Sequence, residues 1–278
     1  MHISEGTTFN LFGGTIQNGK AAADANVRVR GIFNMYGGTI QNGTASGSGG
    51  NVGLFAYSSS FRNQAFSMYG GTISGGTAGS YGGNIRIYAH AAAGSAYDNT
   101  AKFFFSGGLI TGGQANNGGN IAFYGASAKT NSVAYAGYAQ GEISGGVIEN
   151  GTANAEGGNI YLRGYKGKVN DLFTDYVVMT NGTIRNGVAG TNGGNVAIGY
   201  SSQPSMFKMS GGQVLDGIAN GGYGGNISVN LWSVFLLEDG LVSGGTVNST
   251  ENGNPVYKKD NKDDPNRNKN GTDTSTNV

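Results

Sequence analysis

The amino-acid sequence predicts an all-β protein, a right-handed parallel β-helix in which a single chain winds through a solenoid of about eight coils. A repeat of 24 to 38 residues runs along most of the chain, and apolar residues alternate with a period of two inside each copy. Glycine contributes 54 of the 278 residues, and many of these glycines stand in pairs at constant places in the repeat. Together these observations favour short strands joined by tight corners.

The first half of the repeat has the form Phe-x-Met-x-Gly-Gly-Thr-Ile-x-Asn-Gly-x-Ala. Its second glycine is found at Gly14, Gly38, Gly71, Gly108, Gly146, Gly182, Gly212 and Gly240. Parallel coils stack about 4.8 Å apart, so equivalent residues of successive coils should lie on top of one another. We therefore predict ladders of Phe, Met and Ile side chains inside the tube, with small Ala residues at a tight corner.

The second half of the repeat, Gly-Gly-Asn-Ile-x-Leu, contains an asparagine in seven coils. A buried side-chain amide needs hydrogen-bond partners, and a stacked row of amides can supply them. We predict a structural asparagine ladder formed by Asn26, Asn51, Asn84, Asn120, Asn159, Asn195 and Asn226.

Two other repeat architectures fit less well. Glycine pairs would destabilise the helices of an α-solenoid, and the apolar period is two instead of 3.6. A β-propeller needs about 40–45 residues in each blade, and repeats of varying length would be hard to place in it.

The run Phe33-Asn34-Met35-Tyr36-Gly37-Gly38-Thr39-Ile40-Gln41-Asn42-Gly43-Thr44-Ala45, followed by Gly49-Gly50-Asn51-Val52, resembles the pectate-lyase-like β-helix repeats of bacterial surface proteins and adhesins. The resemblance covers residues 6–249 and implies a secreted or cell-surface location. It implies no particular activity, because the same fold is found in pectate lyases, polygalacturonases, phage tailspikes and adhesins.

Length variation is concentrated in one part of the repeat. The ladder asparagine follows the second glycine by 12–14 residues, whereas the next second glycine follows the asparagine by 12 to 26 residues, most in the middle coils. All insertions therefore leave the tube at one corner, which we call the insertion corner, and such insertions often form a binding face. They combine tyrosine with small polar residues, as antibody paratopes do. The predicted ligand-binding residues are Tyr57, Tyr88, Tyr97, Tyr124, Tyr135, Tyr138, Arg163, Tyr165, Lys166 and Tyr176.

Composition narrows the range of partners. The net charge is +1 and only 12% of residues are charged, so we expect no nucleic-acid binding. No apolar run approaches the roughly 20 residues of a membrane span, so we expect no membrane insertion. The chain has no cysteine and two histidines, and we expect no metal and no cofactor. We expect a monomer, and we expect Trp232 to pack against the last coil.

We predict a non-catalytic binding or adhesion module that recognises a host glycoprotein, an immunoglobulin or a polysaccharide. A polysaccharide lyase or glycoside hydrolase is the first alternative, since Asp171 and Asp175 share an insertion with Lys166, and Asp98 could meet His90. These groups lack a distinctive motif and are also typical of solvated loop clusters. A structural stalk is the second alternative.

The composition changes near the end of the chain. We expect residues 1–249 to form the β-helix domain, and the polar residues 250–278, in which positive and negative charges balance, to form a flexible linker. The first residues do not resemble a secretory signal, and we expect this chain to be a fragment of a larger protein.

Overall fold

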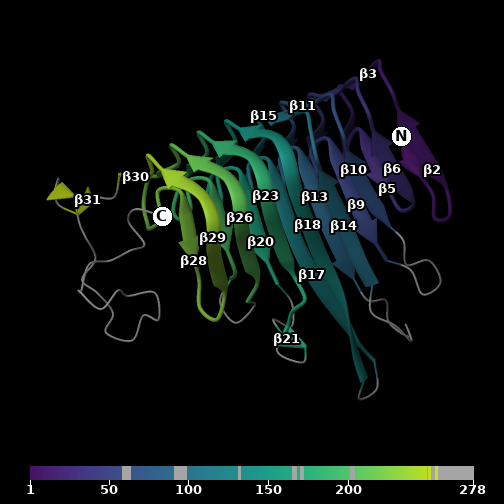
Figure 1. Ribbon diagram of the computed structural model, residues 1–278. Helices are drawn as coiled ribbons and strands as arrows, with labels where there is room; N and C mark the ends of the chain where they lie inside the picture. Colours follow the sequence, from purple (N-terminus) through teal and green to yellow (C-terminus); the bar gives the residue numbers. More distant parts are fainter. Residues whose placement is uncertain are drawn as a thin grey trace.

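The computed structural model describes residues 1–57, 64–90, 99–130, 133–164, 168–169, 172–200, 204–248, 250–251 and 254–255. The described chain is a parallel β-helix, and the predicted solenoid fold is confirmed (Figure 1). Each coil contributes to three faces, which we name sheets A, B and C. Sheet C has eight strands, one for each of the eight coils that the described residues form.

Sheet A is built from β1 (His2–Ile3), β5 (Val27–Val29), β9 (Val52–Ala56), β13 (Ile85–His90), β17 (Ile121–Thr130), β20 (Ile160–Arg163), β25 (Val196–Ile198) and β28 (Ile227–Val229). Sheet C is built from β4 (Lys20–Ala21), β8 (Thr44–Ala45), β12 (Thr77–Ala78), β16 (Gln114–Ala115), β19 (Thr152–Ala153), β24 (Val188–Ala189), β27 (Ile218–Ala219) and β30 (Thr246–Val247).

Sheet B contains β2 (Thr8–Leu11), β6 (Ile32–Met35), β10 (Ala65–Met68), β14 (Asn99–Phe105), β18 (Val133–Glu149), β23 (Tyr176–Arg185), β26 (Met206–Leu215) and β29 (Val234–Ser243). In the first four coils the glycine pair interrupts sheet B, and the chain resumes as β3 (Thr15–Gln17), β7 (Thr39–Gln41), β11 (Thr72–Ser74) and β15 (Leu109–Thr111). Two short antiparallel pairs complete the described strands, namely β21 (Lys168–Val169) with β22 (Leu172–Phe173), and β31 (Thr250–Glu251) with β32 (Asn254–Pro255).

The predicted ladders form the core. Phe33 of β6 pairs in register with Phe9 and Phe66, and Ile73 of β11 pairs with Ile40 and Ile110. The side chains of Phe33, Phe66, Ile40, Ile73 and Ile110 are fully buried. Successive residues on a strand point to opposite sides of the sheet. The apolar residues, which recur at every second position, therefore all point into the tube.

The asparagine ladder is continuous from Asn26 to Asn226. In each step the Nδ2 of one asparagine donates to the Oδ1 of the next, at 2.7–2.8 Å. Asn120, for example, also accepts a hydrogen bond from the backbone N–H of Gly113 at 2.9 Å and donates to the carbonyl of Glu149 at 2.7 Å. These partners satisfy both groups of a fully buried amide.

The insertion corner lies between sheet A and sheet B. Strands β17 and β18 extend beyond the tube there as an antiparallel hairpin, and β21 projects from the same side of the molecule (Figure 1). Loop length therefore varies where the chain passes from sheet A to sheet B, while the short corner at the asparagine ladder stays constant.

Candidate functional site

The outer face of sheet A carries a strip of aromatic and arginine side chains. Outward positions on this sheet alternate with buried ones, so Arg28 stands between the buried Val27 and Val29. The aromatic–arginine strip, as we call it, consists of Arg28, Arg30, Phe55, Tyr57, Tyr81, Arg86, Tyr88, Tyr124, Tyr161, Arg163 and Tyr200.

The strip is packed along the axis of the solenoid. Phe55, Tyr88 and Tyr124 occupy the same register position in β9, β13 and β17. Their ring centroids are 5.2 Å and 4.5 Å apart, and Tyr81 lies 4.8 Å from Tyr124. The rings therefore cover part of one another's faces, and this contact makes the half-buried row rigid.

A buried ion pair anchors one end of the strip. The Asp24 carboxylate, whose side chain is inaccessible, accepts a hydrogen bond from Arg86 Nη2 at 2.6 Å across the intervening coil. Gly53 lies beneath the pair, and a Cβ there would collide with Asp24. Burial raises the pKa of Asp24, and the nearby Arg86 guanidinium opposes that shift. Arg86 in turn lies 5.6 Å from the Phe55 ring centroid, so the pair holds the arginine against the aromatic row.

Arg163 marks the other end of the strip. It stands opposite Tyr124 in the sheet register and donates to the hydroxyl of Tyr81 at 3.2 Å. Its guanidinium also lies 5.1 Å from the ring of Tyr200, which is half exposed. Tyr161 is buried beneath this end, and burial raises the pKa of its hydroxyl.

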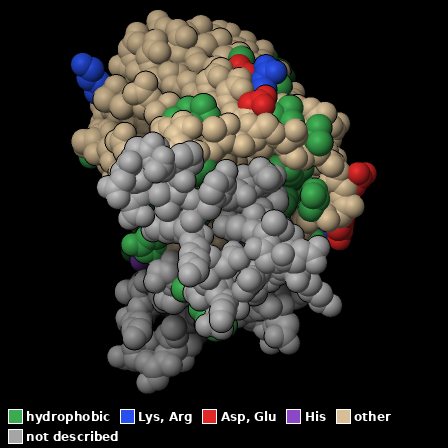
Figure 2. Space-filling model, turned by 90° about the vertical axis from the view of Figure 1, so that its left-hand side faces the viewer, with side chains coloured by type: hydrophobic (Ala, Val, Ile, Leu, Met, Phe, Trp, Pro, Cys, Tyr) green, Lys and Arg blue, Asp and Glu red, His purple; other side chains and the backbone are tan. Residues whose placement is uncertain are grey.

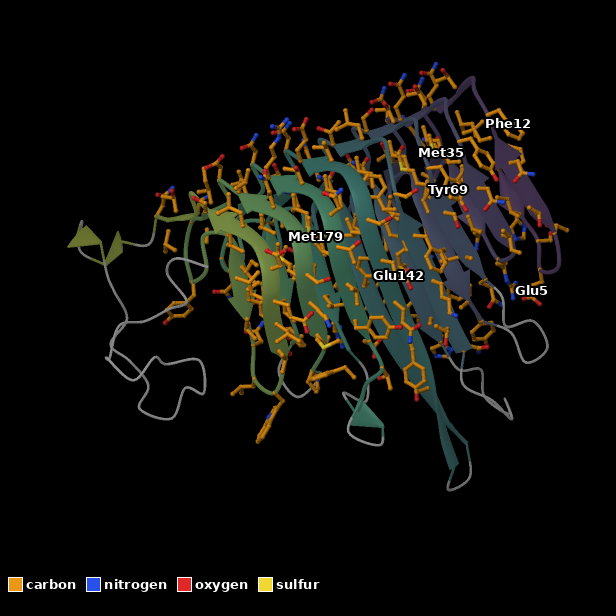
Figure 3. The ribbon with its side chains drawn as sticks, in the orientation of Figure 1. Glu5, Phe12, Met35, Tyr69, Glu142 and Met179 are labelled. Atoms are coloured by element: carbon orange, nitrogen blue, oxygen red, sulfur yellow. The ribbon has the colours of Figure 1, made fainter. Side chains whose placement is uncertain are left out.

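A groove crosses the outer face of sheet B on the other side of the insertion corner. Its larger part has a volume of about 520 Å³ and is lined by Glu142, Ile143, Ser144, Phe173, Tyr176, Val178, Thr180 and Met206. A smaller depression adjoins it and is lined by Lys102, Phe103, Phe104, Gln140, Gly141, Glu142 and Tyr176. Glu142 and Tyr176 belong to both, and Glu142 lies midway along the solenoid (Figure 3). Burial and the neighbouring Glu142 charge raise the pKa of Tyr176.

The predicted ligand-binding residues are divided between these two surfaces. Tyr57, Tyr88, Tyr124 and Arg163 lie in the aromatic–arginine strip, and Tyr176 lies in the groove. Tyr97, Tyr165 and Lys166 lie outside the described residues, as does the side chain of Tyr135 on β18. The structure thus brings together four of the predicted residues on one face.

Two expectations need correction. Tyr138 on β18 is only 8% exposed, so it packs within the molecule instead of facing a partner. Asp175 is fully buried and accepts a hydrogen bond from the backbone N–H of Ala139 at 2.8 Å, so it is a structural group and not part of a solvated cluster. Asp98 and Asp171 lie outside the described residues.

The prediction that Trp232 packs against the last coil is wrong. Trp232 occupies a tight turn from Asn230 to Ser233, has a φ of 66° and is 76% exposed. Figure 2 views the molecule from the end of the last coil, where hydrophobic side chains are exposed.

Sequence reasoning missed several members of the strip and one of the groove, namely Arg28, Arg30, Phe55, Tyr81, Arg86 and Tyr161 in the strip and Glu142 in the groove. The period of two carried a usable signal, because Arg86 stands between inward-facing Ile85 and Ile87, and an aromatic or arginine in such an outward position is not required by the core.

Among the described residues, no group of three histidine, aspartate or glutamate side chains is placed to hold a metal ion. The described part of the chain also contains no helix with the length and hydrophobicity that a membrane span requires. In comparisons with known proteins, no family model matches the chain, and no curated protein or solved structure is detectably similar to it.

Proposed function

We propose that this chain is a non-catalytic binding module of a bacterial cell-surface or secreted protein, and that it docks a host protein or glycoprotein on the aromatic–arginine strip. The observation that carries the proposal is the strip itself, a rigid row of outward tyrosine, phenylalanine and arginine side chains beside the insertion corner. These residue types are enriched in the centres of protein interfaces.

The orientation of the rings supports a protein partner over a sugar platform on this face. A sugar would stack on an open ring face, whereas Phe55, Tyr88 and Tyr124 lean on one another. The row therefore presents ring edges, tyrosine hydroxyls and the aliphatic parts of arginine side chains to a partner. These groups suit the mixed polar and apolar surface of a protein. The packing also reduces the side-chain entropy lost on binding.

The enzymatic alternative receives less support. Glycosidases of the usual type place two carboxylates across the scissile bond. Of the described side chains that line the sheet B groove, Glu142 alone carries a carboxylate.

The proposal can be tested with the triple variant Tyr57→Ala, Tyr88→Ala and Tyr124→Ala. We expect its binding to immobilised immunoglobulin or serum glycoproteins to be at least about tenfold weaker than that of the unchanged chain, since interface aromatics contribute about 2 kcal/mol or more each. Surface plasmon resonance would measure the affinity, and far-ultraviolet circular dichroism would confirm the β fold.

A matched control is available on another face. Tyr36 and Tyr69 are about half exposed, and their rings stack at 5.0 Å, but neither belongs to the strip. The double variant Tyr36→Ala and Tyr69→Ala should bind normally. Equal loss of affinity in both variants, or none in the triple variant, would contradict the site.

A further inference from the structure

The sheet B groove is a second, chemically different surface. It crosses four adjacent strands, β14, β18, β23 and β26, and so extends for about 15 Å along the solenoid. Its main volume, about 520 Å³, lies within the usual range of small-ligand sites, about 300–1,000 Å³.

The groove combines hydrogen-bonding groups with apolar walls. Outward positions in the register place Gln140 beside Lys102 and Tyr176, and place Glu142 between Phe104 and Val178. Ser144 and Thr180 add hydroxyl groups on the same face, and Phe173 and Met206 add apolar surface. The site thus offers a carboxylate and hydroxyls as acceptors, an amide and an ammonium as donors, and aromatic rings for C–H groups.

Glu142 is the charged residue in the described lining of the larger part of the groove, whereas Lys102 lines the smaller depression. Glu142 is exposed, and within the described part of the chain no arginine, lysine or histidine forms a salt bridge with it. A carboxylate at the centre of the groove can accept two hydroxyl donors at once, but it repels an anionic ligand. This combination fits a polyhydroxylated, uncharged ring with one apolar face.

We propose that the sheet B groove binds a neutral hexopyranose unit of a glycan, with Glu142 accepting hydrogen bonds from vicinal sugar hydroxyls and Tyr176 and Phe173 packing against the sugar's C–H face. The inference stands on the groove alone and does not depend on a protein partner at the aromatic–arginine strip. It assigns no bond cleavage to the site.

The test uses the full chain and short neutral oligosaccharides of glucose, galactose, mannose and N-acetylglucosamine, with an oligogalacturonate as the acidic comparator. Saturation-transfer NMR detects the bound sugar, and isothermal titration calorimetry measures its affinity. We expect at least one neutral oligosaccharide to bind, and the oligogalacturonate to bind at least about tenfold more weakly.

Two variants locate the site. Glu142→Gln should weaken neutral sugar binding by about tenfold, because a charge-assisted acceptor is lost. Thr180→Trp should abolish binding, since Thr180 is exposed and a large ring there fills the groove without entering the core.

Two variants serve as controls. Asn34→Trp lies in the same outward column of sheet B as Glu142, but near the first coil, and Glu238→Gln lies in the last coil. Both should bind sugar normally. The proposal is overturned if no neutral oligosaccharide binds, if the acidic one binds equally well, or if Thr180→Trp leaves the affinity unchanged. Because the strip variants are tested on proteins, failure here is separate from failure of the proposed protein docking.

Discussion

Single residues matter most for the stability of this solenoid where a buried polar group depends on one fixed set of hydrogen-bond partners. Asn120 shows this most clearly, because its amide joins Asn84, Asn159, Gly113 and Glu149 in one buried network. Gly113 is equally constrained, since a Cβ at that position would collide with the Gly119 carbonyl. The repeated Asn and Gly thus depend on each other in each of the seven coils that carry a ladder asparagine.

Replacing Asn120 with alanine should lower the free energy of unfolding by about 4 kcal/mol, because several buried donors and acceptors lose their partner at about 1–3 kcal/mol each. Urea unfolding followed by circular dichroism would measure the change. Asn34→Ala is the matched control, since its hydrogen bond to Asn10 is exposed, and it should cost less than about 0.5 kcal/mol. Similar costs for the two variants would contradict the role given to the ladder.

At the scale of single strands, a small side chain on one sheet is compensated by a large side chain on the opposite sheet. The phenylalanine column of sheet B is interrupted by Gly141 in β18, and in the same coil the inner column of sheet A carries Phe123 in place of an aliphatic residue. A Cβ at Gly141 would lie 2.7 Å from Cε1 of Phe123. One large ring therefore fills the tube from the opposite wall.

This compensation predicts coupled substitutions. Gly141→Val should cost about 3 kcal/mol through overpacking against Phe123, and Phe123→Leu should cost about 1–2 kcal/mol through the space it leaves. The double variant should cost less than the sum by at least about 1 kcal/mol. Urea unfolding of all three variants completes the cycle.

The control pairs Gly141→Val with Leu54→Ala, two coils away from Phe123 in the same inner column. Those two effects should add to within about 0.5 kcal/mol. If the costs of Gly141→Val and Phe123→Leu also add, the tube accommodates each side chain independently, and the proposed compensation is wrong.

For the molecule as a whole, each coil is stabilised only by its neighbours, as in other solenoids. The isoleucine ladder illustrates this, because Ile110 is fully buried between Ile73 and Ile148. Ile16 in the first coil pairs on one side with Ile40, is half buried, and has no second ladder partner among the described residues. We therefore expect the middle coils to be the most stable part of this chain, and they also support the aromatic–arginine strip and the groove.

The same substitution should consequently have different effects along the axis. Ile110→Ala should cost about 3–4 kcal/mol, and Ile16→Ala about 1–2 kcal/mol, because less surface is buried in the first coil. Urea unfolding measures both variants, and amide hydrogen exchange should show that Ile16→Ala increases exchange mainly in the first coils. Equal costs at the two positions would contradict a nearest-neighbour model.

The sequence by itself determined the fold, the three inward ladders and the asparagine ladder. The physical reason is that successive coils rise by one strand spacing of about 4.8 Å, so a repeat in the sequence becomes a contact in space. The insertion corner followed from the same reasoning, because extra residues can leave the tube only where no ladder holds the chain.

Only the tertiary structure decided which side chains meet outside the tube. Asp24 and Arg86 are 62 residues apart and touch because Gly53 leaves room between them. The sequence predicts that both Tyr124 and Tyr176 bind a ligand at the insertion corner, yet they lie on different sheets, since the chain turns that corner between them. Outward residues repeat over only a few coils, as Phe55, Tyr88 and Tyr124 do, so most of their contacts depend on side-chain size and on which neighbouring coil leaves space.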